Sequence, residues 1–194
     1  ATDTFVADWK LGIVQKAVQA HGLSPEFRPV LTSPAKSRRR AKFSGRRTKK
    51  GAMVGFHGRA SHTLFAVPDC QLVTPALLDI LPALEALTVL ACSRKGEIDL
   101  TVTDAPLGPD VLVTTDKELT SQLRIEMAAF ANHHGLSRLV WNDEPVVTIN
   151  PPAQDFGGTK VTPPPGAFLQ ATKHGETMLL QAVEEITAKA QRVV

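Results

Sequence analysis

The chain has 194 residues, of which 43% are hydrophobic and 5% aromatic, with no Tyr. Two cysteines are too few for a disulfide framework, and no apolar run resembles a membrane span or a signal peptide, so we expect a cytoplasmic protein with no membrane partner. Of the 22 Lys and Arg, eight fall in residues 37–50, and the other 14 face 19 Asp and Glu. The positive charge is therefore local, as in a protein that presents a cationic patch to a polyanion.

The first predicted element is an amphipathic helix. Apolar residues recur at helical spacing from Phe5 to Val18, and Gly22 marks its end. Three prolines, Pro25, Pro29 and Pro34, exclude a continuing helix and indicate an extended connector.

The basic run begins with the period-2 pattern of a strand. Residues 38–43 read RRRAKF, so Arg38, Arg40 and Lys42 would share a wet face, opposite the side chains at the alternate positions. Residues 45–51, GRRTKKG, are typical of a turn, and residues 52–58 and 61–67 are two further predicted strands. Together they predict a basic antiparallel β-meander over about residues 38–67.

The remaining elements alternate between helices and strand pairs. Thr74 and Pro75 open a leucine-rich helix that continues to Leu90, and strands are predicted over residues 97–104 and 110–115. A second amphipathic helix over 117–135 precedes strands at 138–141 and 145–150. This order predicts an α+β fold with two amphipathic helices packed against antiparallel sheet.

The last section is rich in Pro and Gly and leads into a terminal helix. The pair Gly157–Gly158 favours a tight hairpin over a phosphate loop, because it lacks the length and helix-start context of such a loop. The final helix is predicted over about residues 175–194. The predicted organisation is an N-terminal helix (1–22), a central α+β domain (23–150), and a linker with a helix (151–194).

No complete active site is evident from motif spacing. The six histidines and two cysteines do not form a zinc motif, and no Gly-x-Ser-x-Gly turn is present. Cys70 has two interpretations: a small buried side chain, or a metal ligand whose partners lie elsewhere. Cys92 has only the first.

The basic run is the strongest functional candidate. A strand and a turn would present its cations rigidly, and the scarcity of aromatic residues favours phosphate and shape contacts, as with structured RNA. The candidate RNA-binding residues are Arg38, Arg39, Arg40, Lys42, Arg46, Arg47, Lys49 and Lys50. The alternatives are a solvated charge run and a site for an acidic protein.

Five runs in order resemble one family. They are WKLGIVQKAV, SRRRAKF, VGFHGRASHTLFAVPDCQL with its following leucine helix, LVWNDEPVVTINPP and PPPGAFLQAT. They resemble the middle portion of bacterial S-adenosylmethionine-dependent RNA (uracil-5-)-methyltransferases, the 23S rRNA type, over nearly the whole chain.

The resemblance implies roles for three residues. Cys70 matches the fourth ligand of a 4Fe-4S cluster whose first three cysteines precede the Trp-Lys helix, so no cluster is expected on these residues alone. Phe168 matches a base-pocket residue beside a flipped-out uridine, and Gln170 matches a residue near S-adenosylmethionine. Thr172 stands where the family commonly has Asn.

The resemblance also implies what the chain does. The family's glycine-rich cofactor turn and nucleophilic cysteine would follow residue 194, so we expect a central fragment, inactive alone, that grips rRNA, or tRNA, and contributes to the base pocket. The terminal segments would pack on the methyltransferase domain, and their exposed apolar faces would favour self-association. The alternative is a stand-alone RNA-binding module without catalysis.

Overall fold

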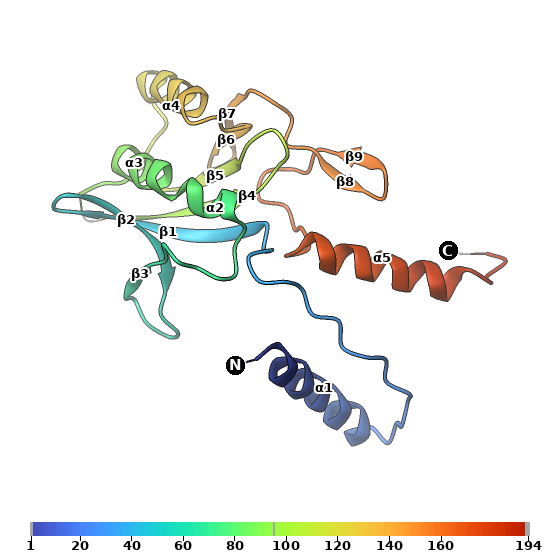
Figure 1. Cartoon of the computed structure of the whole chain (residues 1–194). Helices are drawn as coiled ribbons and strands as arrows, with labels where there is room; N and C mark the ends of the chain where they lie inside the picture. The colour runs from blue at the N-terminus through green and yellow to red at the C-terminus, as the bar shows by residue number, and fades with distance from the viewer. Residues whose placement is uncertain (1, 95, 193–194) are drawn as a thin grey trace. The chain divides into compact units, whose positions relative to one another are not determined.

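The computed structural model describes residues 2–94 and 96–192. The chain divides into two compact units: Ala1–Pro34 with Lys173–Val194, and Ala35–Thr172. The fold is α+β, as predicted, with a mostly antiparallel seven-stranded sheet in the second unit (Figure 1). Within the described ranges, no helix is long and apolar enough to cross a membrane.

The first unit contains two helices. Helix α1 (Asp3–Ala20) begins where Thr2 Oγ1 accepts a hydrogen bond from Phe5 N at 3.3 Å, and it ends before Gly22, as predicted. Helix α5 (Lys173–Thr187) starts earlier and ends earlier than predicted, and residues 193–194 lie outside the described residues. Neither helix has a buried residue; the side chains of Trp9 and Ile186 are 58% and 73% exposed.

The large sheet has the strand order β3-β2-β1-β4-β5-β6-β7. Its strands are β1 (Arg40–Thr48), β2 (Gly51–His57), β3 (Leu64–Ala66), β4 (Glu97–Thr103), β5 (Asp110–Thr114), β6 (Arg138–Trp141) and β7 (Glu144–Thr148). The pairing is antiparallel, as predicted, except that β5 and β6 are parallel. Helix α4 (Ser121–His133) connects them, and such a crossover returns the chain in the same direction.

The predicted turn at residues 45–51 is mostly strand. Strand β1 continues to Thr48, and only Lys49 and Lys50 form the turn, because β1 is hydrogen-bonded to β2 on one side and to β4 on the other. Gly45 instead lets β1 pack closely against the helix that contains Thr88, because a Cβ at this position would lie 2.3 Å from Thr88 Oγ1. Arg46 and Arg47 are therefore strand residues.

The predicted leucine-rich helix is two helices, α2 (Pro75–Asp79) and α3 (Leu81–Ala91). The break at Ile80 is explained by Pro82, which has no amide hydrogen and whose ring would clash with the carbonyl four residues earlier. Helices α2, α3 and α4 lie on one face of the sheet (Figure 1), and their apolar residues, including Leu77, Leu87 and Met127, form the core with Phe43 and Leu100.

A small hairpin follows the large sheet. Strands β8 (Gln154–Phe156) and β9 (Thr159–Val161) are joined through Gly157 and Gly158, whose φ angles of 62° and 92° are accessible to glycine at little cost. The predicted tight hairpin is confirmed. The segment 162–172 then returns to the start of β1, where Thr172 bridges to Arg38.

Candidate RNA interface

Residues 38–43, which lead into β1 and form its first part, have one exposed and one buried side, as the alternation predicted. Arg38 and Lys42 are exposed and Arg40 is half-buried, whereas Arg39, Ala41 and Phe43 are buried. Because successive side chains of a strand point to opposite faces, the cations of the first set form a row along one side.

This row borders a groove. Arg38, Arg40 and Lys42 line a hollow of about 420 Å³ together with Ala41, Phe56, Leu72 and Val73, which we call the cationic groove. Phe56 is half-buried and stacks on Phe43, with ring centroids 4.9 Å apart and planes inclined by 24°. The volume lies within the range of small-ligand pockets, roughly 300–1,000 Å³. The lining combines cations with apolar surface, a combination that suits a nucleotide.

Arg39 is turned into the fold. Its side chain donates from Nε to the Gln170 carbonyl at 3.2 Å and from Nη1 to Gln154 Oε1 at 3.4 Å, and the residue is only 7% exposed. Gln154 Nε2 in turn donates to the Asp104 carbonyl at 3.1 Å. Arg39 thus connects β1 to two distant segments and does not belong to the exposed cationic row.

The segment 166–172 is held against the start of β1. Arg40 Nη2 donates to the Gly166 carbonyl at 2.9 Å, and Arg39 N donates to the Ala171 carbonyl at 2.9 Å. Leu169 is buried, yet Phe168, one residue earlier, is 80% exposed. The segment is therefore fixed at several points and presents an aromatic ring to solvent, while the Gln170 side-chain amide makes no hydrogen bond within the described residues.

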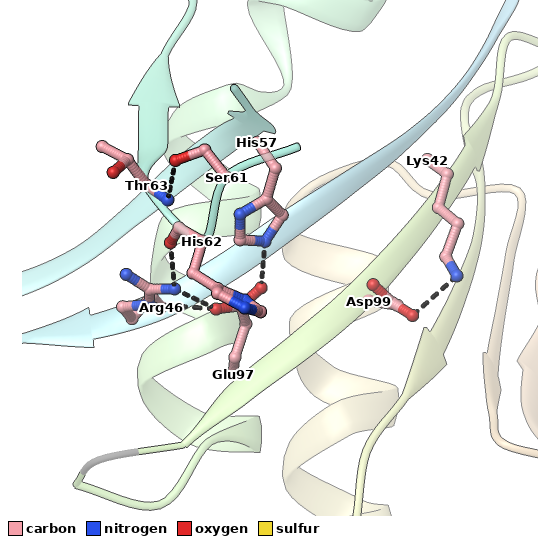
Figure 2. A network of polar contacts seen from close by, with 8 residues as sticks. All are labelled: Lys42, Arg46, His57, Ser61, His62, Thr63, Glu97 and Asp99. Atoms are coloured by element: carbon pink, nitrogen blue, oxygen red, sulfur yellow. Dashed lines mark hydrogen bonds and ion pairs between the residues drawn. The ribbon is translucent and has the colours of Figure 1, made fainter. Parts of the chain in front are cut away.

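Two cations of β1, Arg46 and Lys42, share their face of the sheet with two acidic residues of β4 (Figure 2). Glu97 Oε2 accepts from Arg46 Nη2 at 2.5 Å and from Arg46 Nε at 2.9 Å, and its other oxygen contacts His57 Nε2. Lys42 Nζ lies 2.7 Å from Asp99 Oδ2. Partial burial would raise the pKa of the Glu97 carboxyl, but the hydrogen bonds from Arg46 and His57 outweigh it and lower that pKa.

Arg46 also anchors the loop between β2 and β3. Its Nη2 donates to the His62 carbonyl at 3.0 Å, and within the same loop Thr63 N donates to Ser61 Oγ at 3.0 Å (Figure 2). By contrast, the side chains of Arg38, Arg47, Lys49 and Lys50 make no hydrogen bond or ion pair within the described residues.

A buried ion pair stabilises the sheet beside this site, and sequence reasoning missed it. Arg138 donates to both Asp110 oxygens at 2.8 Å and to the Pro163 carbonyl at 3.0 Å, with side-chain exposures of 10% for Arg138 and 11% for Asp110. The only sequence signal was that β5 and β6, which are otherwise mostly apolar, each begin with a charged residue, Asp110 and Arg138. Their parallel pairing, Asp110 with Arg138, brings the charges together.

The residues present do not by themselves fit an iron–sulfur cluster. Cys70 and Cys92 are the only cysteines in the 194 residues, and among the described residues no group of three His, Cys, Asp or Glu side chains could hold a metal ion. Cys70 is half-buried, and its Sγ accepts a hydrogen bond from Leu72 N at 3.4 Å. Its role as a fourth cluster ligand stays a prediction.

The chain matches known proteins along its whole length. It is 31% identical over 193 residues to a Rhizobium meliloti protein named as an RNA methyltransferase, covering 100% of this chain and 46% of that protein. A Brucella suis protein of the same description is 30% identical over 185 residues, covering 95% and 45%. The 23S rRNA (uracil(1939)-C(5))-methyltransferase of Shewanella sediminis is 26% identical over 160 residues, covering 78% and 36%. No family model matches.

A solved structure has the same fold. The Pyrococcus abyssi tRNA (uracil-54, C5)-methyltransferase, crystallised with S-adenosyl-L-homocysteine, superposes with a TM-score of 0.61 over 92% of this chain and 48% of its own, at 13% identity. The chain spans about half the length of the curated relatives it matches most extensively. Together, the fold and the sequence matches along most or all of this chain place it with the proteins named RNA methyltransferases, and the family resemblance read from its five sequence runs is confirmed.

Proposed function

We propose that this chain provides the RNA grip of an enzyme that transfers a methyl group from S-adenosylmethionine to C5 of a uridine. The substrate we favour is ribosomal RNA, with transfer RNA as the second candidate, following the names of the Shewanella and Pyrococcus proteins. The observation that carries the proposal is the exposed row of Arg38 and Lys42 beside the cationic groove. Cations held on a strand can contact several phosphates at once.

We assign the hairpin cations to the same grip. Arg47, Lys49 and Lys50 continue the basic run beyond the groove, and within the described residues their side chains make no hydrogen bond or ion pair that RNA would have to displace; Lys49 and Lys50 are exposed and Arg47 is half-buried. Each phosphate contact adds to the salt dependence of binding because it releases condensed counterions.

We assign Phe168 to the base pocket and Gln170 to the cofactor side of it. An exposed aromatic ring on a fixed backbone can stack on an unpaired base, and methylation at C5 requires that the base leave its helical stack. S-adenosylmethionine, when bound, supplies the electrophilic methyl group. The side-chain amide of Gln170 fits a cofactor contact, because Arg39 bonds to the backbone carbonyl of Gln170 and not to its side chain.

The first test is a salt titration of RNA binding. Fluorescence anisotropy with a structured rRNA stem-loop, at salt concentrations from about 50 to 200 mM, should show affinity falling steeply with salt. Replacing Arg38 and Lys42 by Ala should weaken binding several-fold, and replacing Lys49 and Lys50 by Ala should do the same. The matched control is the double variant of Lys10 and Lys16 to Ala, which removes two positive charges from α1.

Two results would contradict the RNA grip. One is binding that does not change with salt. The other is an equal loss of affinity in the control and in the groove variant, which would leave only a general charge effect.

Methyl transfer is tested separately. The enzyme proposal expects the whole protein to methylate C5 of uridine in RNA when S-adenosylmethionine is added, whereas residues 1–194 alone should bind RNA without methyl transfer. RNA binding with no methylation by the whole protein would favour the stand-alone RNA-binding module instead.

We also propose that residues 1–194, when isolated, self-associate through the apolar residues of α1 and α5. Trp9, Ile13, Leu179, Leu180 and Ile186 are each between 42% and 73% exposed, which is unusual for large apolar side chains on two helices of one unit. Sedimentation velocity should show a dimer that dissociates on dilution. A monomer at every concentration would contradict this proposal.

A further inference from the structure

Two carboxylates lie among the cations of the proposed RNA-binding face. Glu97 and Asp99 are two residues apart on β4, so their side chains share one side of the strand, opposite the buried Ile98 and Leu100. In the pairing of β1 with β4, Glu97 lies directly across from Arg46, and Asp99 reaches Lys42 diagonally (Figure 2).

These ion pairs are accessible to solvent. Side-chain exposures are 40% and 31% for Arg46 and Glu97, and 62% and 38% for Lys42 and Asp99. Ion pairs with this exposure contribute little to stability, because water competes for both partners and salt screens them. A phosphate can therefore replace either carboxylate at small cost.

The two kinds of cation on this face differ in what binding requires. Lys49 and Lys50, in the exposed turn beside it, have no side-chain partner within the described residues, so they attract any polyanion. Arg46 and Lys42 must exchange a carboxylate for a phosphate, and Glu97 and Asp99, which stay negatively charged, repel that phosphate.

We infer that Glu97 and Asp99 are specificity-determining residues that compete with RNA phosphate for Arg46 and Lys42, and so weaken binding to RNA that does not fit the face. This inference rests on the proposed function. Specificity is a difference of affinities, and unfavourable contacts with the wrong partner are one way to obtain it. A fitting RNA recovers the loss through contacts elsewhere on the face, and an unrelated RNA does not.

The test removes the two negative charges with little change of shape. The double variant Glu97→Gln and Asp99→Asn is compared with the matched control Glu126→Gln and Asp143→Asn. Both control residues are exposed. Glu126 lies on α4, which covers the opposite face of the sheet, and Asp143 lies in the turn between β6 and β7. Both variants raise the net charge by the same amount, so long-range attraction changes similarly.

The measurement is anisotropy with two probes, a structured rRNA stem-loop and an unstructured polyuridine of equal length. The inference expects polyuridine to bind several-fold more tightly to the Glu97/Asp99 variant than to the control, with less gain for the stem-loop. The salt slope should steepen by about 0.9 per new phosphate contact on duplex RNA, taking the value for B-DNA. Thermal unfolding of both variants checks that the fold is intact.

Three outcomes would overturn the inference. Equal gains in the two variants would leave only net charge, and a loss of affinity would mean that the carboxylates orient the cations for binding. Equal gains for the two RNAs would show that no specificity is involved. If the unmodified chain shows no salt-dependent RNA binding, the proposed function fails as well; if it does and only the variants disagree, this inference alone fails.

Discussion

The two halves of the basic run have similar composition and different tasks. In the first half, Arg39 is buried and, with Arg40, donates hydrogen bonds to the segment 166–172, so these cations belong to the fold. In the second half, Arg47, Lys49 and Lys50 form a hairpin end with no side-chain partner in the described chain. The number of positive charges in the run is therefore larger than the number of cations whose side chains are free of other contacts in the fold.

The difference arises from what lies beside each half. The backbone around Arg38 is hydrogen-bonded to Leu72 and Thr74, and Arg39 N to Ala171, so two other segments cover this end of β1. The hairpin end extends past β4, whose pairing with β1 stops at Arg46. The first half is therefore connected, through Arg39 and Arg40, to the segment that carries Phe168, whereas the side chains of Lys49 and Lys50 in the second half are exposed.

The largest expected effect is on stability. Arg39→Met would leave the Gln154 side chain and the Gln170 carbonyl without their donor, and lost hydrogen bonds to a charged group typically cost about 1.5–3 kcal/mol. Lys49→Met, at the exposed turn, should change the free energy of unfolding by no more than about 0.5 kcal/mol. Urea denaturation of both variants checks the contrast, and equal stabilities would refute the distinction between the two halves.

The second-largest expected effect is on RNA binding and concerns Phe168, whose segment is hydrogen-bonded to Arg39 and Arg40. Phe168→Ala should leave stability nearly unchanged, since the side chain is 80% exposed, but should weaken binding of an RNA with an unpaired uridine by about 1–3 kcal/mol, the usual value of one base stacked on an aromatic ring. Phe65→Ala, at a 56% exposed position on β3, is the control. Equal losses in both variants would count against a specific role for Phe168.

The smallest effect is the pH dependence conferred by Glu97. Its pKa is lowered in the folded state, so its stabilisation is present above the pKa of the unfolded carboxyl and is lost as pH falls through the folded value. Glu97→Gln should therefore reduce the difference in unfolding free energy between about pH 7 and about pH 3. The effect should be small because the pair is partly exposed. An unchanged pH profile would mean that the pair is not formed in solution.

Local patterns in the sequence determined most of the elements. The alternation RRRAKF correctly divided exposed from buried positions in β1, because a strand's side-chain period depends only on the backbone. The glycine pair in β8–β9 and Thr120 at the start of α4 also act through neighbours in sequence. Pro82 is also a local signal for the break between the two helices, but the regular spacing of leucines led to the prediction of a single helix. The family resemblance likewise came from short local runs.

The surroundings of each cation depend on contacts between segments that are distant in sequence. Arg39 bonds with residues 115 and 131 positions away, and Arg138 with one 28 positions away, so no local pattern could show that these side chains are structural. The parallel pairing of β5 with β6 and the closeness of Glu97 to Arg46 likewise depend on strand order. The concentration of positive charge in residues 37–50 can be read from the sequence alone. Long-range packing sets which of these cations are buried, which are paired and which stay exposed, because burial and ion pairing depend on neighbours in space.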